Sequence, residues 1–396
     1  MSVGSLPDIK YSRTPYLIVT TEQTQRKDVY GSIDDHVVRQ AQLLRGAEPS
    51  DTVIVAMHPI GSPAYLPAFP QLARRGFHVI GCGTRYTGGD ASLQMENALL
   101  DLAACVRDAR ERLGYQKVIL AGWSGGGSLM AGYQAEAEQR RITETAAGEY
   151  TPLADTELLP ADGLLLMAAH RSRHVLVTEF LDPSILDEDH PDDRDPTLNL
   201  YDPRNPDKPP FSPQYMARYR AAQIERNRRI TARAQGRLAA LREQGRPDDE
   251  HCFVVQGTMA DPRWVDPSVD PNDRRPNWSY LGDPRIVNDG PAGLARYTTL
   301  RGWLSQWGYD TAQVDAVAAA PRITVPVLTL MNSADDACPP SHLRDFYAAL
   351  PAGRKEMHVI EGANHYFSGG GQQRAHLDRA VGYARAWADQ YGLGAP

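Results

Sequence analysis

The chain has 396 residues, of which 42% are apolar and 23% are charged, and its formal net charge is −7. Such a length and composition are typical of a folded protein with a large core. The acidic balance argues against a nucleic-acid-binding protein, because no overall basic field is present. No apolar run approaches the length that is needed to cross a membrane.

The four cysteines are widely spaced and show no metal-ligand spacing: Cys82, Cys105, Cys252 and Cys338. Residues 1–7 lack the basic-then-apolar pattern of a secretion signal. We therefore expect reduced thiols and a cytoplasmic location.

The first 50 residues show no regular pattern, and we expect a strand at 16–20 and a helix at 37–44. From residue 52 onward, buried strands alternate with amphipathic helices. The strands are expected at 52–57, 77–82, 118–121, 163–168, 325–331 and 356–360. One helix is expected between the turn at 58–62 and Arg75, and others at 92–113, 128–138, 341–350 and 373–391. This alternation indicates βαβ units and a parallel sheet.

Regularity stops between residues 171 and 320, where an acidic, proline-broken run is followed by an arginine-rich helix expected at 213–244. We interpret this segment as an insertion between two strands of one sheet. The predicted domains are thus a core in two parts, 1–170 and 321–396, with the insertion 171–320 between them. The arginines are expected to pair with neighbouring acids, with binding of an anionic group as the alternative.

The most informative stretch is Gly122-Trp123-Ser124-Gly125-Gly126, which follows the apolar run 118–121. A serine on a sharp strand-to-helix turn has strained backbone angles, and glycines on both sides remove Cβ clashes. A glycine-rich turn that binds phosphate or nothing is the alternative interpretation.

The pattern G-x-S-x-G resembles the nucleophile elbow of the α/β-hydrolase superfamily. This resemblance implies a mostly parallel central sheet flanked by helices, with 171–320 as a mainly helical or irregular cap. It also implies that Ser124 is the nucleophile and that the base is His365, in the loop after the last strand. The order Ser, Asp, His along the chain is the order of this fold.

The carboxylate that orients the histidine is expected after the strand 325–331, in the segment 332–339. This segment resembles the family's G-x-x-D-x-x-x-P loop, with Asn332 in place of the usual glycine. That alignment selects Asp335 as the triad acid, and Asp336 is the competitor.

Negative charge that develops on the carbonyl oxygen needs backbone N–H donors. One is expected from Gly125, directly after the nucleophile. The resemblance places the other in the loop that begins at His58, and because Pro59 has no N–H, we expect Ile60 to donate. Further candidates for substrate contact are His58, which we expect mainly to orient this loop, and four residues at the same rim: Gly61, Trp123, Arg85 and Tyr86.

The sequence thus predicts a serine hydrolase that cleaves a carboxylic ester or a related acyl bond, with neither metal nor organic cofactor. Thioesters, lactones, amides, a carbon–carbon bond next to a ketone and acyl transfer are alternatives for the same triad. A silent ligand-binding scaffold is the alternative outside enzymes. The expected partner is a small-molecule acyl substrate, without nucleic acid or membrane, and a homodimer is the candidate assembly.

Overall fold

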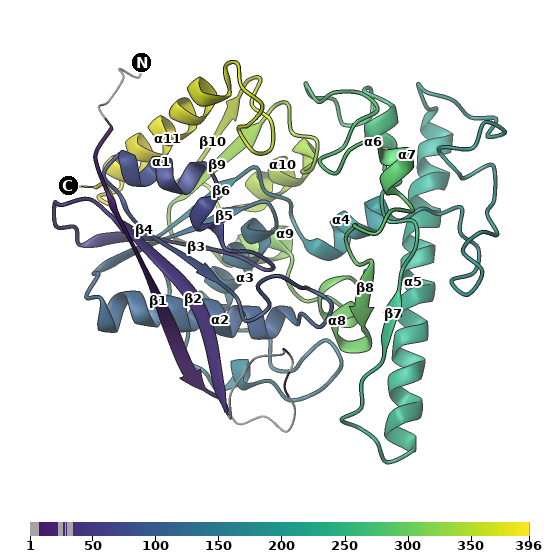
Figure 1. Ribbon diagram of the computed structural model, residues 1–396, viewed down its shortest axis with the longest axis horizontal. Coiled ribbons are helices and arrows are strands. Elements are labelled where there is room, and N and C mark those ends of the chain that lie inside the picture. Colours follow the sequence, from purple (N-terminus) through teal and green to yellow (C-terminus); the bar gives the residue numbers. More distant parts are fainter. Residues whose placement is uncertain (1–7, 23–26, 28, 30–34, 396) are drawn as a thin grey trace.

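The computed structural model describes residues 8–22, 27, 29 and 35–395. Eight strands form one sheet, and helices cover both of its faces (Figure 1). The strands of this sheet are β1 (Ser12–Thr21), β2 (His36–Arg45), β3 (Thr52–His58), β4 (His78–Gly83), β5 (Lys117–Trp123), β6 (Gly163–Met167), β9 (Val327–Asn332) and β10 (Lys355–Ile360). The helices outside the insertion are α1 (Ala68–Arg74), α2 (Met95–Arg107), α3 (Gly125–Glu138), α10 (Pro340–Ala349) and α11 (Gln373–Gln390).

The strands lie in the order β1-β2-β4-β3-β5-β6-β9-β10. Pairing is antiparallel between β1 and β2 and between β2 and β4, and parallel in every other pair of this sheet. One antiparallel strand in an otherwise parallel sheet, with helices in the crossovers, confirms the predicted fold class. The chain has the α/β-hydrolase fold.

The prediction of a helix at 37–44 is wrong, because these residues belong to β2. Exposed and buried side chains alternate along this strand: Val37, Arg39 and Ala41 are buried, whereas Val38 and Gln40 are exposed. A period of two is the signature of a strand with one covered face. The strand expected at 16–20 is confirmed as part of β1, its antiparallel partner.

The core lies on both faces of the sheet. Along β3, Val53, Val55 and Met57 pack into the apolar cluster that includes residues of α2, α3 and α10. The intervening Ile54 and Ala56 pack into a second cluster, with residues of α1 and α11. A strand that is buried on both faces needs apolar residues at every position, which explains its unbroken apolar run.

The chain between β6 and β9 extends beyond the carboxyl ends of the strands, on the right of Figure 1. Its helices and strands are α4 (Arg173–Phe180), α5 (Pro213–Glu243), β7 (Cys252–Val254), α6 (Pro262–Val265), α7 (Pro284–Val287), β8 (Tyr297–Thr299), α8 (Leu300–Gln306) and α9 (Ala316–Ala319). The long helix α5 confirms the helix expected at 213–244 and packs against α4 and α8. Among the described residues, no helix combines the length and the apolar character that crossing a membrane requires.

Candidate active site

Ser124 lies at the turn between β5 and α3, with φ 54° and ψ −124°. An L-residue rarely adopts this conformation, so the surrounding packing must hold it. The turn leaves no space for a Cβ two residues before or two residues after the serine. A Cβ on Gly122 would lie 2.6 Å from the Gly126 oxygen, and one on Gly126 would lie 2.5 Å from the Met57 oxygen. The glycines therefore allow the turn that presents Ser124 at the carboxyl edge of the sheet.

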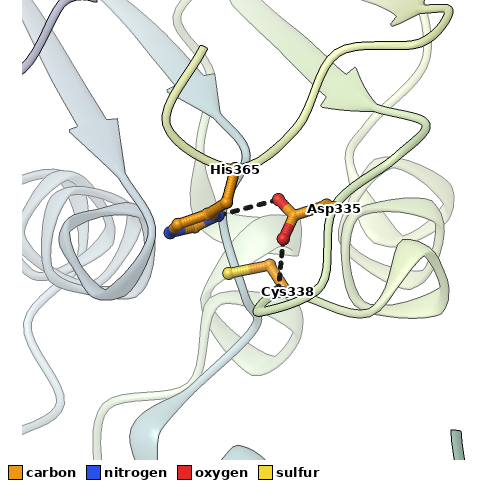
Figure 2. A group of neighbouring side chains, drawn as sticks. All are labelled: Asp335, Cys338 and His365. Carbon is orange, nitrogen blue, oxygen red and sulfur yellow. Dashed lines mark hydrogen bonds and ion pairs between the residues drawn. The ribbon is translucent and has the colours of Figure 1, made fainter. Parts of the chain in front are cut away.

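His365 and Asp335 meet at the same edge, from the loops after β10 and β9 (Figure 2). His365 Nδ1 lies 2.9 Å from Asp335 Oδ2, and both side chains are almost fully buried. Asp335 Oδ1 accepts the backbone N–H groups of Ala337 and Cys338, each at 2.8 Å. This carboxylate thus accepts hydrogen bonds on both oxygens and fixes the orientation of the imidazole.

Asp336, the competing aspartate, has a different environment. Its backbone oxygen accepts the indole N–H of Trp264 at 2.9 Å. Burial, together with the neighbouring charge of Asp335, raises the pKa of Asp336 to about 6. The structure brings Asp335 to the histidine, and no hydrogen bond between Asp336 and His365 exists among the described residues.

Asp335, Cys338 and His365 also form a compact group whose potential metal-ligand atoms lie within 4.8 Å of one another (Figure 2). A metal would need the thiolate of Cys338 and a free lone pair on the imidazole. Burial and the charge of Asp335 raise the pKa of the Cys338 thiol, which favours its protonated form. The facing atoms of Asp335 and His365 already bond to each other. These residues fit a hydrogen-bonded Asp–His pair beside a neutral thiol better than a metal site.

A cavity of about 130 Å³ opens in front of the serine. Its lining includes Ser124 and Gly125 from the elbow, His365, and Trp123, whose indole N–H donates to the His365 carbonyl oxygen at 3.2 Å. Ser124 Oγ lies 3.7 Å from Cys338 Sγ. The remaining lining residues are His58, Ile60, His170, Arg173, Leu176, Tyr280, Leu294, Trp307, Ala337, Cys338 and Tyr366.

The loop after β3 reaches this cavity through His58 and Ile60. The Ile60 N–H donates to His58 Nδ1 at 3.3 Å. Burial, with the nearby charge of Arg173 as the second cause, lowers the pKa of His58 to about 3. The ring is therefore neutral near pH 7, and because Nδ1 accepts, its proton is on Nε2. Gly125 is the first residue of α3, where helix N–H groups have no intrahelical acceptor.

Three of the residues that the sequence suggested for substrate contact are not part of the cavity lining. The Arg85 guanidinium instead bonds to Asp101 and Glu22, with Nη1 and Nη2 each 2.8 Å from a Glu22 oxygen. Tyr86 is 1% exposed and belongs to the core cluster beside α2. Gly61 forms an isolated bridge with His58 within its own loop. Their position after a strand placed these residues at the correct rim, but packing and ion pairing turn them away from the cavity.

Several lining residues were not identified from the sequence. His170 and Arg173 directly follow β6, at the same carboxyl edge that supplies Ser124 and His365. This position is the signal that could have identified them. Tyr280 and Leu294 come from irregular parts of the insertion, where no local pattern indicates a direction toward the cavity. Trp307 lines the cavity directly after α8.

No protein-family model matches this sequence, and no curated protein matches it significantly. Among solved structures, it is similar to a thermophilic esterase from Thermogutta terrifontis, at 16% identity over 96% of this chain and 99% of the other, with a TM-score of 0.44. It is also similar to the α/β hydrolase GrgF from Penicillium sp. sh18, at 10% identity over 97% and 99% of the chains, with a TM-score of 0.48. A monoacylglycerol lipase from Paleococcus ferrophilus has 17% identity over 87% and 97%, with a TM-score of 0.42.

Proposed function

We propose that this chain, which has the α/β-hydrolase fold, is a serine hydrolase that cleaves a carboxylic ester or a related acyl bond of a small molecule. One observation carries the proposal. Ser124, on its strained turn, lines the same cavity as His365, whose other ring nitrogen is bonded to the buried Asp335. These are the three groups that nucleophilic acyl transfer by serine requires, and they come from three separate loops.

In the proposed reaction, the Ser124 hydroxyl turns from Cys338 toward His365 and transfers its proton to Nε2 as Oγ attacks the acyl carbon. The tetrahedral intermediate collapses when His365 returns this proton to the leaving oxygen, which departs as an alcohol. Water then attacks the acyl-enzyme with His365 again as base, and the products are the carboxylic acid and free Ser124. Asp335 stabilises the imidazolium in both halves.

Gly125 is the proposed backbone donor to the oxyanion, and Ile60 can be the second donor only if its N–H leaves His58 Nδ1, to which it donates in this structure. The contact between the Ile60 N–H and His58 Nδ1 supports a further role for His58, because it fixes the ring proton on Nε2. A Cβ on Gly125 would lie 3.1 Å from this Nε2, so the ring edge faces the elbow. The neutral His58 ring can therefore donate its Nε2–H to the oxyanion. Because the ring is not an imidazolium, it does not compete with His365 as the general acid.

The insertion, residues 171–320, is the proposed cap of the active site. It contributes Arg173, Leu176, Tyr280, Leu294 and Trp307 to the cavity lining. A cavity of this size, with both apolar and polar side chains in its lining, suits a small acyl substrate. All four cysteines are unpaired, and we propose the cytoplasm as the location, because thiols persist there.

The test is hydrolysis of a panel of p-nitrophenyl esters with acyl chains of increasing length. The wild type should release p-nitrophenol, and Ser124→Ala should reduce the rate to the background. Ser128→Ala is the matched control, because this buried serine of α3 does not line the cavity, and the variant should retain activity. Thioester, lactone and amide substrates then identify the bond type. Equal rates for Ser124→Ala and the wild type would refute the proposal.

A further inference from the structure

Arg173 is a buried cation at the wall of the catalytic cavity, with only 4% of its surface exposed. Two parts of its guanidinium are held by the protein: Nε donates to Gln306 Oε1 at 3.0 Å, and Nη2 donates to Asp90 Oδ2 at 2.6 Å. Its Cζ lies 4.1 Å from the centre of the Trp307 ring. These contacts fix the plane of the guanidinium and make the side chain rigid.

The third nitrogen of this fork, Nη1, donates to no acceptor among the described residues. It points toward the elbow, because a Cβ on Gly125 would lie 3.7 Å from it. His170 faces the same place: its Nε2 would lie 3.3 Å from that Cβ, and its buried Nδ1 has no partner in the described part of the chain. Arg173 Nη1 is not among the described buried atoms that lack a partner, so it is accessible from the cavity and can donate to a bound ligand.

The described lining of the cavity contains a cationic side chain and no carboxylate. Burial, and secondarily the neighbouring His342 and Arg173, lower the pKa of His170 well below its usual value, so this ring is neutral. His58 is neutral for the same reason. Among the described lining residues, Arg173 therefore brings the permanent positive charge. Its counter-ion Asp90 is partly exposed and binds the opposite side of the fork.

We propose that the substrate carries a carboxylate close to its scissile acyl bond, and that Arg173 Nη1 and His170 bind this carboxylate beside Gly125. The proposal rests on the hydrolase function proposed above and specifies its substrate class. Leu176, Leu294 and Trp307 provide apolar walls for the part of the substrate between its carboxylate and its scissile acyl bond. Arg173 acts here as a specificity residue, because its charge contacts the carboxylate and not the reacting atoms.

The test compares esters that differ only in this charge. In the first pair, the anion mono-p-nitrophenyl glutarate carries its carboxylate on the acyl side of the scissile bond, and its methyl ester is the neutral counterpart. In the second pair, p-acetoxybenzoate carries its carboxylate on the leaving group, and its methyl ester is again the neutral counterpart. Because a hydrogen bond to a charged group contributes more than a neutral one, the wild type should prefer the anion of one pair by about 10- to 100-fold in kcat/KM.

Arg173→Gln should reduce that preference by the same factor. Both substrates of a pair are measured on one preparation, and its thermal unfolding is recorded to show that the variant is folded. Arg171→Gln is the matched control. Arg171 lies two residues earlier, pairs with Asp315 at 2.8 Å, and does not line the cavity, so its variant should keep the wild-type preference. Arg173→Lys keeps the charge but loses the planar fork, and an intermediate preference is expected.

An experiment on the wild type alone covers the case in which Arg173→Gln does not fold. Glutarate should inhibit hydrolysis of a neutral ester at concentrations at which the uncharged glutaramide does not. If the neutral esters are hydrolysed but neither anionic ester is preferred and glutarate does not inhibit, the carboxylate proposal is overturned while the hydrolase function stands. If no ester is hydrolysed, and Ser124 does not react with a fluorophosphonate, the hydrolase function itself fails.

Discussion

The sheet and the insertion are stabilised in different ways. Apolar side chains from both faces of the sheet form the two largest clusters of the molecule. The apolar clusters of the insertion are smaller, and buried arginines also cross-link its irregular segments. Arg226 of α5 is fully buried, forms a two-point pair with Glu188, and donates to three backbone oxygens from two other segments. The arginine-rich helix thus pairs with the acidic run that precedes it.

The sheet and the insertion are proposed to have different tasks in the active site, namely bond cleavage and substrate selection. The proposed bond-breaking groups, Ser124, Asp335 and His365, lie in loops of the sheet, whose positions are fixed by the strands. The groups proposed to select the substrate come mainly from the insertion, and Arg173 begins the first helix after the sheet. A substitution in the first set should therefore affect the rate with little effect on stability. A substitution among the residues of the insertion should change stability or substrate selectivity more than the rate of bond cleavage.

The largest expected effect concerns the triad acid. Asp335→Asn should lower kcat by about 10⁴-fold, because an amide would hold the imidazole in the wrong tautomer. Asp336→Asn should stay within a few-fold of the wild type, because the hydrogen bond to His365 Nδ1 comes from Asp335. Steady-state hydrolysis of a p-nitrophenyl ester by both variants distinguishes the two aspartates. The reverse ranking would transfer the role to Asp336.

Two arginines of α5 should show how the insertion is held. Arg226→Ala removes one partner of a buried pair and should lower the free energy of unfolding by about 3 to 5 kcal/mol. Arg228→Ala removes an exposed pair with Asp310 and should cost far less than Arg226→Ala. Urea unfolding, followed by tryptophan fluorescence, measures both. Equal losses would contradict the view that buried ion pairs cross-link the insertion.

A smaller effect is expected for the pH dependence of stability. The pKa of Asp336 is raised to about 6 in the folded protein, above its value in the unfolded chain. Its protonated form therefore stabilises the fold at low pH, and this contribution is lost as the pH rises from about 4 through about 6. Asp336→Asn should consequently be more stable than the wild type by about 1 to 2 kcal/mol at pH 7, with no difference near pH 3.5. Chemical unfolding at both pH values checks this sign, and a variant less stable at pH 7 would refute it.

The sequence allowed much of the fold to be predicted, because strands buried on both faces appear as unbroken apolar runs. It failed at β2, where one exposed face made the pattern ambiguous between a strand and a helix. Ser124, Asp335 and His365 could be selected because each follows a strand, and the structure brings Asp335 and His365 into contact. Arg85 has a similar position but is held by Asp101 and Glu22, which no local pattern reveals. Tyr280 and Leu294 reach the cavity through irregular chain, whose path depends on tertiary contacts.

The central claim is that Ser124 is a nucleophile activated by His365 and Asp335. A fluorophosphonate probe that becomes covalently attached to an activated serine tests it most directly. Peptide mapping by mass spectrometry should place the probe on Ser124 in the wild type, and Ser124→Ala should not be labelled. His365→Gln should be labelled far more slowly, because the hydroxyl then lacks its base. An unlabelled wild type, or a probe attached to another residue, would contradict the account.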